Sequence, residues 1–524
     1  MKKTIGLLLV LLFAAVILAA GCTSSGVKTA TGDENLNTLT VGEMWTVSSI
    51  DPGDGHGGGT FITEKAIILE TLVGADENFA LTPNLATEWE QIDDTTWEFK
   101  LREGVKFHNG KEMTAEQVKF SLDNIAEKSP NTVTLLDYKD SRVIDKYTIR
   151  IYTNTLNPLV PGTLHYPDTS IVHEDSYDAD GTFITPIGTG PMVLESYNEQ
   201  TGEVVVVKNN DWWGGVPNID KMIIRGYENP QTRAMVAENG EVLFTVDPPY
   251  SEVDRLNALD GIHAEKYNTP RIYKMDVNLN HPGMNDKNVR KAISYAIDRD
   301  GIVENVLYSV GSSAGGVFLP SMTWSNETLK PYAYDVNLAK QYLADSGWTD
   351  SDGDGYVDKD GKRLTLKILT YTERPGLPPM LEAVSANLKS IGIEVEEVSM
   401  ENSALTPIIS SGDWDLYLAA YNLAMVPDPE YVLKGWYTTN SPSNNAGYSN
   451  PIVDQMIIDG HQITDLNERY DHFRVIEGIV YDDLPTINIA YYGVAVVMDD
   501  SVTGYKFDPT AHDYRIDPFM EISN

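Results

Sequence analysis

The sequence has one cysteine, few basic residues and a single long apolar run. With only Cys22, a disulfide framework is excluded. The 39 Lys and Arg residues against 77 Asp and Glu residues give a net charge of −38, which argues against a nucleic-acid partner because phosphate attracts a basic surface. The nine histidines show no metal-ligand spacing, so the sequence does not predict a transition-metal site built from histidine.

The chain does contain enough apolar material for a core. Its 524 residues allow two to four domains at roughly 150 residues each. Hydrophobic residues make up 42% of the chain and charged residues 22%, a globular composition that excludes disorder as a description of the whole. Beyond the N-terminal apolar run, no segment is apolar enough to span a bilayer.

The N-terminus resembles the leader of an exported lipoprotein. Two lysines precede an apolar stretch over residues 5–20, which is short for a membrane span, and small residues then lead to Cys22. Ala19 departs from the pattern, because leucine is commonest three residues before the lipidated cysteine. We expect residues 1–22 to be signal peptide and lipobox, and 23–37 to be a flexible tether that holds the protein on the outer face of the cytoplasmic membrane. The alternative is a plain secretory signal with an incidental cysteine.

The remaining chain shows the patterns of a mixed α/β protein. Residues 97–101 alternate as a half-buried strand, and 114–117 fit a capping box that begins a helix. Apolar runs at 204–207 and 223–224 predict strands, and apolar residues over 289–297 have helical spacing.

The clearest supersecondary pattern covers residues 364–399. An alternating strand is followed by a helix with apolar residues spaced 3, 4 and 3, which should end at Gly392, and then by another strand. Strand, helix and strand in so short a stretch predict a βαβ unit with parallel strands and a right-handed crossover.

Two further motifs suggest chemistry, and the context argues against one of them. Ser313 lies in a G-x-S-x-G sequence, the nucleophile elbow of hydrolases, but helical sequence precedes it where a strand is required. His56 lies in a glycine-rich loop that fits either a ligand contact or a flexible surface loop.

An acidic segment fits a calcium loop in part. Asp350, Asp352, Asp354 and Asp358 occupy positions 1, 3, 5 and 9, and the Tyr356 carbonyl occupies position 7. Glycine stands at position 12, where a bidentate glutamate is usual. The segment is therefore either a weak structural calcium site or an Asp/Gly-rich turn, and the sequence leaves both open.

Ordered motifs along most of the chain are similar to those of family 5 extracellular solute-binding proteins, the dipeptide, oligopeptide and nickel-binding components of ABC importers. They include an Ile-Asp-Pro start, a central glycine turn, an Asn-Asp-Trp-Trp segment and an amphipathic helix that ends in Asp-Arg. In chain order these motifs lie at 50–52, 70–72, 101–118, 186–191, 210–217, 289–299 and 339–348.

The resemblance implies an α/β, two-lobed periplasmic-binding-protein fold of the large class II type, with an extra subdomain in the first lobe. We place the first lobe at 38–270 with an insertion near 85–185, the second lobe at 271–489, and a return to the first lobe at 490–524. The implied function is capture of a small solute between the lobes by a monomer, without catalysis or a required cofactor, and delivery to an ABC permease with its ATPase. The same fold would also serve a sensor or a chaperone.

The family also suggests how a peptide would be held. Dipeptide-type members place an aspartate three residues before a late Asp-Pro to bind the α-ammonium group. Here the Asp-Pro is Asp428-Pro429 and Met425 stands at that position. A thioether cannot neutralise an ammonium ion, so Glu43 or Asp413 would have to replace the anchor from another wall.

We expect a peptide or similar small polar solute, and a nickel or metal chelate as the alternative, with Arg271, Tyr273 and His56 as candidate chelate contacts. A secreted hydrolase that uses Ser313 is the rival from another class. The residues that we expect to line the cleft lie at ends of predicted strands or at lobe crossings: Trp45, Arg271, Tyr273, Tyr421, Asn422, Met425 and Tyr492.

Overall fold

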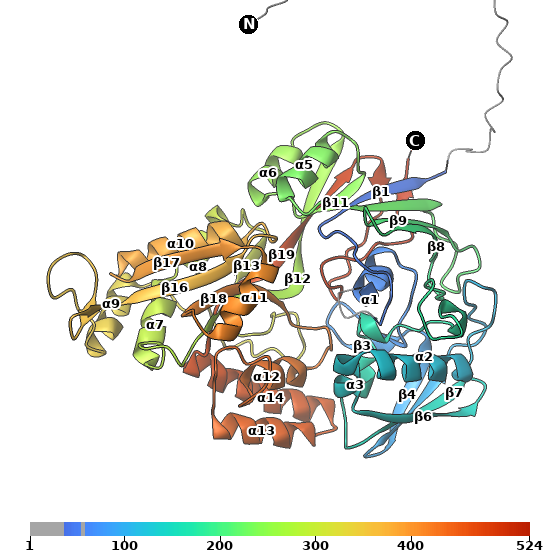
Figure 1. Ribbon diagram of the computed structural model, residues 1–524, viewed down its shortest axis with the longest axis horizontal. Helices are drawn as coiled ribbons and strands as arrows, with labels where there is room; N and C mark the ends of the chain where they lie inside the picture. The colour runs from blue at the N-terminus through green and yellow to red at the C-terminus, as the bar shows by residue number, and fades with distance from the viewer. Residues whose placement is uncertain (1–35, 54–57, 524) are drawn as a thin grey trace, which may run out of the picture. The chain divides into compact units, whose positions relative to one another are not determined.

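The computed structural model describes residues 36–53 and 58–523 (Figure 1). The predicted signal peptide, Cys22, most of the predicted tether and His56 lie outside the described residues. Within the described ranges, no helix is both long and apolar enough to cross a membrane.

Eleven strands form the main sheet, which is mixed parallel and antiparallel. They are β1 (Thr38–Glu43), β8 (Met192–Asn198), β9 (Glu203–Lys208), β10 (Lys221–Gly226), β11 (Phe244–Val246), β12 (Ile262–Val277), β13 (Gly311–Ser313), β16 (Thr365–Tyr371), β17 (Glu394–Met400), β18 (Leu416–Asn422) and β19 (Thr486–Asp499). Their spatial order is β17-β16-β18-β12-β19-β11-β1-β10-β9-β8, with β13 beside β19. The apolar run of β19 is buried along almost its whole length, as a central strand requires.

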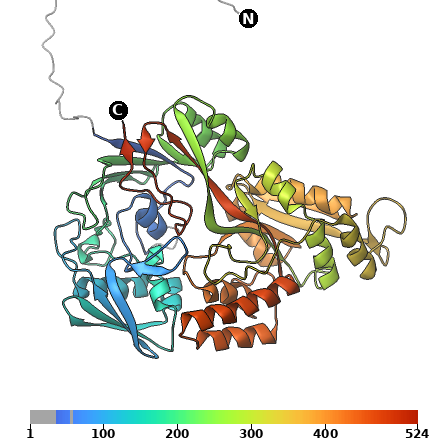
Figure 2. The same cartoon turned by 180° about the vertical axis from the view of Figure 1, so that it is seen from behind.

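The long strands β12 and β19 join two parts of this sheet (Figures 1 and 2). Residues 262–268 of β12 pair with 493–499 of β19, and the register then shifts before pairing resumes at Ile272. From Arg271 onward β12 also pairs with β18, which belongs to the part that contains β16 and β17. The chain thus crosses between the two parts near the positions at which we placed the lobe boundaries.

The predicted βαβ unit is confirmed. β16 and β17 pair in parallel, and the connecting helix α10 (Leu377–Ser390) buries Leu381, Val384 and Leu388. Gly392 follows the helix with φ of +85°, a left-handed conformation that favours glycine after a helix C-terminus. The helix predicted over 289–297 is α7 (Lys287–Ala296), which packs on α9 (Val336–Asp345).

A separate four-stranded antiparallel sheet forms within the predicted insertion. Its order is β4 (Ala86–Asp93), β5 (Thr96–Leu101), β7 (Thr148–Thr153) and β6 (Tyr138–Asp145), and helices α2 (Ala115–Lys128) and α3 (Pro130–Leu136) accompany it. The strand predicted at 97–101 is confirmed. The capping box is wrong in detail. Thr114 precedes α2, but its side chain makes no capping bond, and the Gln117 side-chain amide donates to Glu174.

Three helices near the C-terminal end of the chain enclose a second core cluster. They are α12 (Pro429–Tyr437), α13 (Pro451–His461) and α14 (Leu466–Asp483). Asp428, from the Asp-Pro pair, begins α12 by accepting the backbone N–H of Glu430.

The other elements are short. They are α1 (Gly58–Thr60), η1 (Phe61–Lys65), β2 (Val73–Ala75), β3 (Leu81–Pro83), α4 (Val160–Thr163), η2 (Pro167–Thr169), η3 (Glu174–Ser176), α5 (Pro230–Glu238), α6 (Tyr250–Leu256), α8 (Arg299–Asn305), β14 (Asp358–Lys359), β15 (Lys362–Arg363), α11 (Asn402–Ser411), β20 (Val502–Thr503) and β21 (Glu521–Ile522).

Candidate functional site

A cavity of ≈ 440 Å³ lies between segments that are far apart in the sequence. Its lining comes from residues 43–49 after β1, from α1 and η1, from 166–168 at η2, from Met425 after β18, and from 512–513 near the C-terminus. Among these lining residues, Met425 alone belongs to the predicted second lobe. The cavity therefore lies at the place where the two predicted lobes meet.

One wall is a π-helical turn that carries a lysine. All five residues of η1 are buried, and the turn brings Phe61 and Lys65 to the cavity. The Lys65 ammonium donates to the Tyr514 carbonyl, lies 3.9 Å from the centre of the Tyr514 ring and 3.6 Å from the Glu64 carboxylate. The charge of Lys65 is thus balanced within the protein.

The floor of the cavity is a buried ion cluster. Asp513 lies 3.0 Å from Arg271 Nε and 2.9 Å from Arg374 Nη1. Burial opposes ionisation, but the two guanidinium groups hold the pKa of Asp513 well below its usual range. Burial and the nearby Arg271 charge lower the pKa of His512, so its imidazole is neutral. Arg374 also donates to the Tyr492 hydroxyl at 3.0 Å.

A second carboxylate, Asp168, is held differently. It lies on η2, is half-buried and lines the cavity. Burial raises the pKa of Asp168 to about 6, against the opposing effect of a hydrogen bond from the Tyr166 hydroxyl. Within residues 36–53 and 58–523, no basic side chain forms an ion pair with it.

A third carboxylate, Glu43, ends β1 and is buried at the cavity wall. It accepts hydrogen bonds from the Tyr514 hydroxyl and, at 2.8 Å, from the backbone N–H of Met44. Both of its oxygens therefore have a protein donor, although neither donor carries a charge.

Comparison with known proteins identifies the family. The profile of the bacterial extracellular solute-binding proteins, family 5, matches residues 80–444, which is more than half of the chain. The chain belongs to this family. The predicted resemblance and the two-lobed α/β fold are thereby confirmed.

Relatives and a solved structure agree with this assignment. The nickel-binding protein NikA of Staphylococcus aureus is 25% identical over 501 residues, covering 95% of this chain and 96% of that protein. The oligopeptide-binding protein AppA of Bacillus subtilis is 26% identical over 484 residues, covering 85% and 84%. The crystal structure of a nickel ABC transporter protein from Bacillus halodurans is 27% identical with a TM-score of 0.77, covering 93% of this chain and 100% of that chain. The chain is a solute-binding protein of an ABC importer, from a family that is extracellular or periplasmic.

Some of the predicted cleft residues line the cavity, and others lie next to it. Trp45 and Met425 line the cavity. Arg271 lies behind Asp513, and Asn422 borders a smaller adjoining cavity, with its amide 3.4 Å from His512 Nδ1.

None of the three predicted tyrosines lines this cavity. Tyr273 and Tyr492 are fully buried with ring centres 4.8 Å apart, and neither lines the cavity. Tyr421 donates to Asp276 at 2.6 Å and its ring lies 3.8 Å from the Lys274 ammonium. The fold buries Tyr273 and Tyr492 in the interior, whereas Tyr421 is half-buried and lines a separate cavity beside β18.

Asp413 does not supply the replacement anchor, and that suggestion was wrong. Its side chain is 69% exposed, is paired with Lys367 at 2.7 Å and is not part of the cavity. Glu43, the other suggestion, is part of the cavity wall. Asp168 and Lys65 were not predicted, and only a polar residue beside a proline marks Asp168 in the sequence.

Ser313 does not have the geometry of a nucleophile elbow. It is the last residue of β13, which pairs with β19, and its hydroxyl donates to Asp300. The strand-to-helix turn that would expose a nucleophile is replaced by an extended segment.

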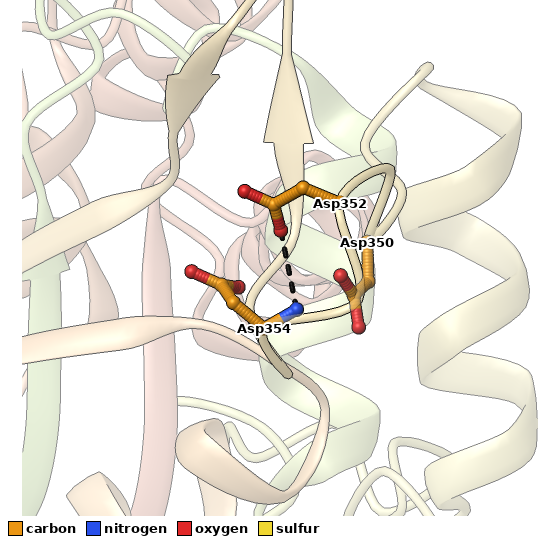
Figure 3. A group of neighbouring side chains, drawn as sticks. All are labelled: Asp350, Asp352 and Asp354. Carbon is orange, nitrogen blue, oxygen red and sulfur yellow. Dashed lines mark hydrogen bonds between the residues drawn. The ribbon is translucent and has the colours of Figure 1, made fainter.

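The acidic loop brings three of its carboxylates together (Figure 3). Oxygens of Asp350, Asp352 and Asp354 lie within 4.8 Å of one another, and all three residues are exposed. Asp352 accepts the N–H of Asp354 at 3.1 Å, and Asp358 is turned to Ser351 instead, accepting its N–H at 3.0 Å.

Proposed function

We propose that the protein captures a peptide or a similar small polar solute in the ≈ 440 Å³ cavity and delivers it to its permease. The observation that carries this proposal is a cavity of ligand size, lined from both predicted lobes, with an aromatic wall and a carboxylate that has no basic partner. Trp45, Phe61 and Tyr166 supply the aromatic wall. The name of AppA, an oligopeptide-binding relative at 26% identity, supports the same ligand class.

A nickel or metal chelate is the alternative ligand. His512 lines the cavity with its imidazole in the neutral, metal-binding form, and Met425 adds a thioether. The nickel-binding relative NikA at 25% identity supports this ligand class. The peptide is favoured because the cavity also holds the unpaired Asp168.

A thermal-shift screen of di- to pentapeptides and of nickel–histidine complexes tests both ligands. At 100 times its Kd, a ligand adds about 2.7 kcal/mol to the free energy of unfolding. A shift with peptides supports the first proposal. A shift with chelates alone contradicts it and supports the alternative.

We infer that Cys22 is lipidated and that a monomeric body is held at the outer face of the membrane. The support is the leader sequence, and the family's extracellular or periplasmic location is consistent with it. Detergent-phase partition of the full chain expressed in a bacterium checks this: the protein should enter the detergent phase, and Cys22→Ser should remain in the aqueous phase. Equal partition of both contradicts lipidation, and light scattering measures the oligomeric state.

We also propose a structural calcium ion in the acidic loop, bound by Asp350, Asp352, Asp354 and the Tyr356 carbonyl. The support is the proximity of the three carboxylates. Asp358 joins only if its side chain leaves Ser351. No cofactor is required for solute capture, and we propose no catalytic activity.

A further inference from the structure

The charged groups around the cavity differ in how many hydrogen bonds and opposite charges the protein provides for them. Lys65 is committed to the Tyr514 carbonyl and to Glu64. Asp513 is shared by two arginines at 2.9–3.0 Å. These groups already have opposite charges beside them, so a ligand charge would have to compete for them.

Two described lining carboxylates, Glu43 and Asp168, have no basic partner. Glu43 has a neutral donor at each oxygen, and Asp168 is the less satisfied of the two. A hydrogen bond from the neutral Tyr166 hydroxyl acts on it, and no described basic side chain pairs with it. Its environment nevertheless removes it from much of the solvent, which raises its pKa to about 6. At pH 7 it is therefore mostly ionised, while neither water nor protein fully compensates the charge.

The backbone beside Asp168 fixes where its carboxylate can lie. A Cβ atom placed on Gly59 would come 2.4 Å from Asp168 Oδ1, so the absence of a side chain at position 59 is what admits the carboxylate. Both residues belong to the segments that form the cavity wall, since Gly58 and Thr60 also line it. The carboxylate is thus held at the wall before a ligand binds.

Met425 lines the same cavity from the predicted second lobe and offers only a thioether. Glu43 already accepts from two neutral donors. A solute that carries a positive charge would therefore find its best unmatched partner at Asp168.

We propose that Asp168, on the first lobe, accepts a charge-assisted hydrogen bond from the primary ammonium group of the solute. The proposal rests on the proposed function and specifies its substrate class: solutes with a free amino group, and not their neutral acylated forms. An ammonium ion offers three donors, and such bonds to a carboxylate are about twice as strong as neutral ones.

Two matched probes test this assignment on the mature protein at pH 7.5. One is a tryptone fraction of short peptides, and the other is the same fraction after its amino groups have been acetylated. We expect the untreated fraction to raise the melting temperature of the wild type and the acetylated fraction to leave it unchanged. An equal shift with both fractions overturns the role of the ammonium group.

Variants test whether Asp168 is the residue that binds the ammonium group. A peptide from the active fraction should bind Asp168→Asn at least tenfold more weakly in calorimetric titration, and should bind Asp413→Asn, an exposed aspartate away from the cavity, as it binds the wild type. Adding Met425→Asp to Asp168→Asn should recover part of the affinity, because it restores a carboxylate to the same cavity. Unchanged affinity in Asp168→Asn overturns the assignment but leaves peptide capture intact. Failure of both fractions to shift the wild type overturns peptide capture and this assignment together.

Discussion

The buried carboxylates among helices α12–α14 differ from Asp168 of the cavity in the partners that the protein gives them. Among the helices, Arg469 pairs with Asp428 at 2.8 Å and with Glu430 at 2.6 Å, and His461 adds a contact of 2.8 Å to Glu430. In the cavity, Asp168 has no described basic partner. The carboxylates that hold the helices together thus have basic partners, whereas the cavity carboxylate Asp168 does not.

The pKa values show the same contrast. Burial opposes ionisation of Glu430, but the hydrogen bond from His461 and the Arg469 charge lower its pKa to about 2. Burial raises the pKa of Asp168 to about 6 because no opposite charge offsets it. The difference is in the partners, since both groups are largely removed from water.

Removing Arg469, the cation that Asp428 and Glu430 share, should strongly lower the free energy of unfolding. Arg469→Met leaves the buried Asp428 without its basic partner and Glu430 with only His461 and Lys434, which costs about 3–5 kcal/mol of unfolding free energy. Urea denaturation measures this cost. The matched control is Lys434→Met: Lys434 lies 3.2 Å from Glu430 but is 54% exposed, so its loss should cost at most about 1 kcal/mol. Equal losses in the two variants would contradict the contrast between buried and exposed partners.

Acid should remove the contribution of Glu430. Its folded-state pKa lies below the unfolded value, so the stabilisation is present above about pH 4.5 and is lost as pH falls toward 2. The shift corresponds to about 3 kcal/mol. Urea denaturation of the wild type and of Glu430→Gln between pH 7 and pH 3 should show a gap that is widest near neutrality and narrows with acid. A gap that does not change with pH would show that charge is not what Glu430 contributes.

The cavity carboxylate should behave with the opposite sign. Because the folded-state pKa of Asp168 is raised, its ionisation weakens the ligand-free protein as pH rises from about 4 through 6. Tyr166 and Tyr431 are the titratable groups that act on it, and they stay neutral in this range. We expect ligand-free Asp168→Asn to match the wild type near pH 4 and to be more stable at pH 8, by about 3 kcal/mol. A variant less stable at pH 8 would mean that Asp168 is a structural group.

The sequence predicted the βαβ unit but neither the helices α12–α14 nor the role of Asp168. The βαβ unit at 364–399 follows from apolar spacing, because burial on one face of a strand or helix is a local property of the chain. The ion pairs of Asp428 and the position of Asp168 on the cavity wall depend on residues that approach one another only through tertiary packing. Tyr273 and Tyr492 illustrate the limit: their strands reach the crossing between the lobes, but only the fold decides which face of each strand is buried.

The acidic loop provides a third case, in which solvent and one ion pair, between Arg363 and Asp354, compensate the carboxylates. Asp350, Asp352 and Asp354 are exposed, and water screens their mutual repulsion. Calcium should therefore add little: without a bidentate glutamate we expect a Kd on the order of 10⁻⁴ to 10⁻³ M, and calcium at its Kd stabilises by about 0.4 kcal/mol. Calorimetric titration of chelator-treated protein measures binding, and Asp352→Asn with Asp354→Asn should abolish its heat. Asp413→Asn, an exposed aspartate outside the loop, should leave that heat unchanged. No heat with the wild type would leave the loop as an acidic turn, its charges balanced by solvent and by the ion pair of Asp354 with Arg363.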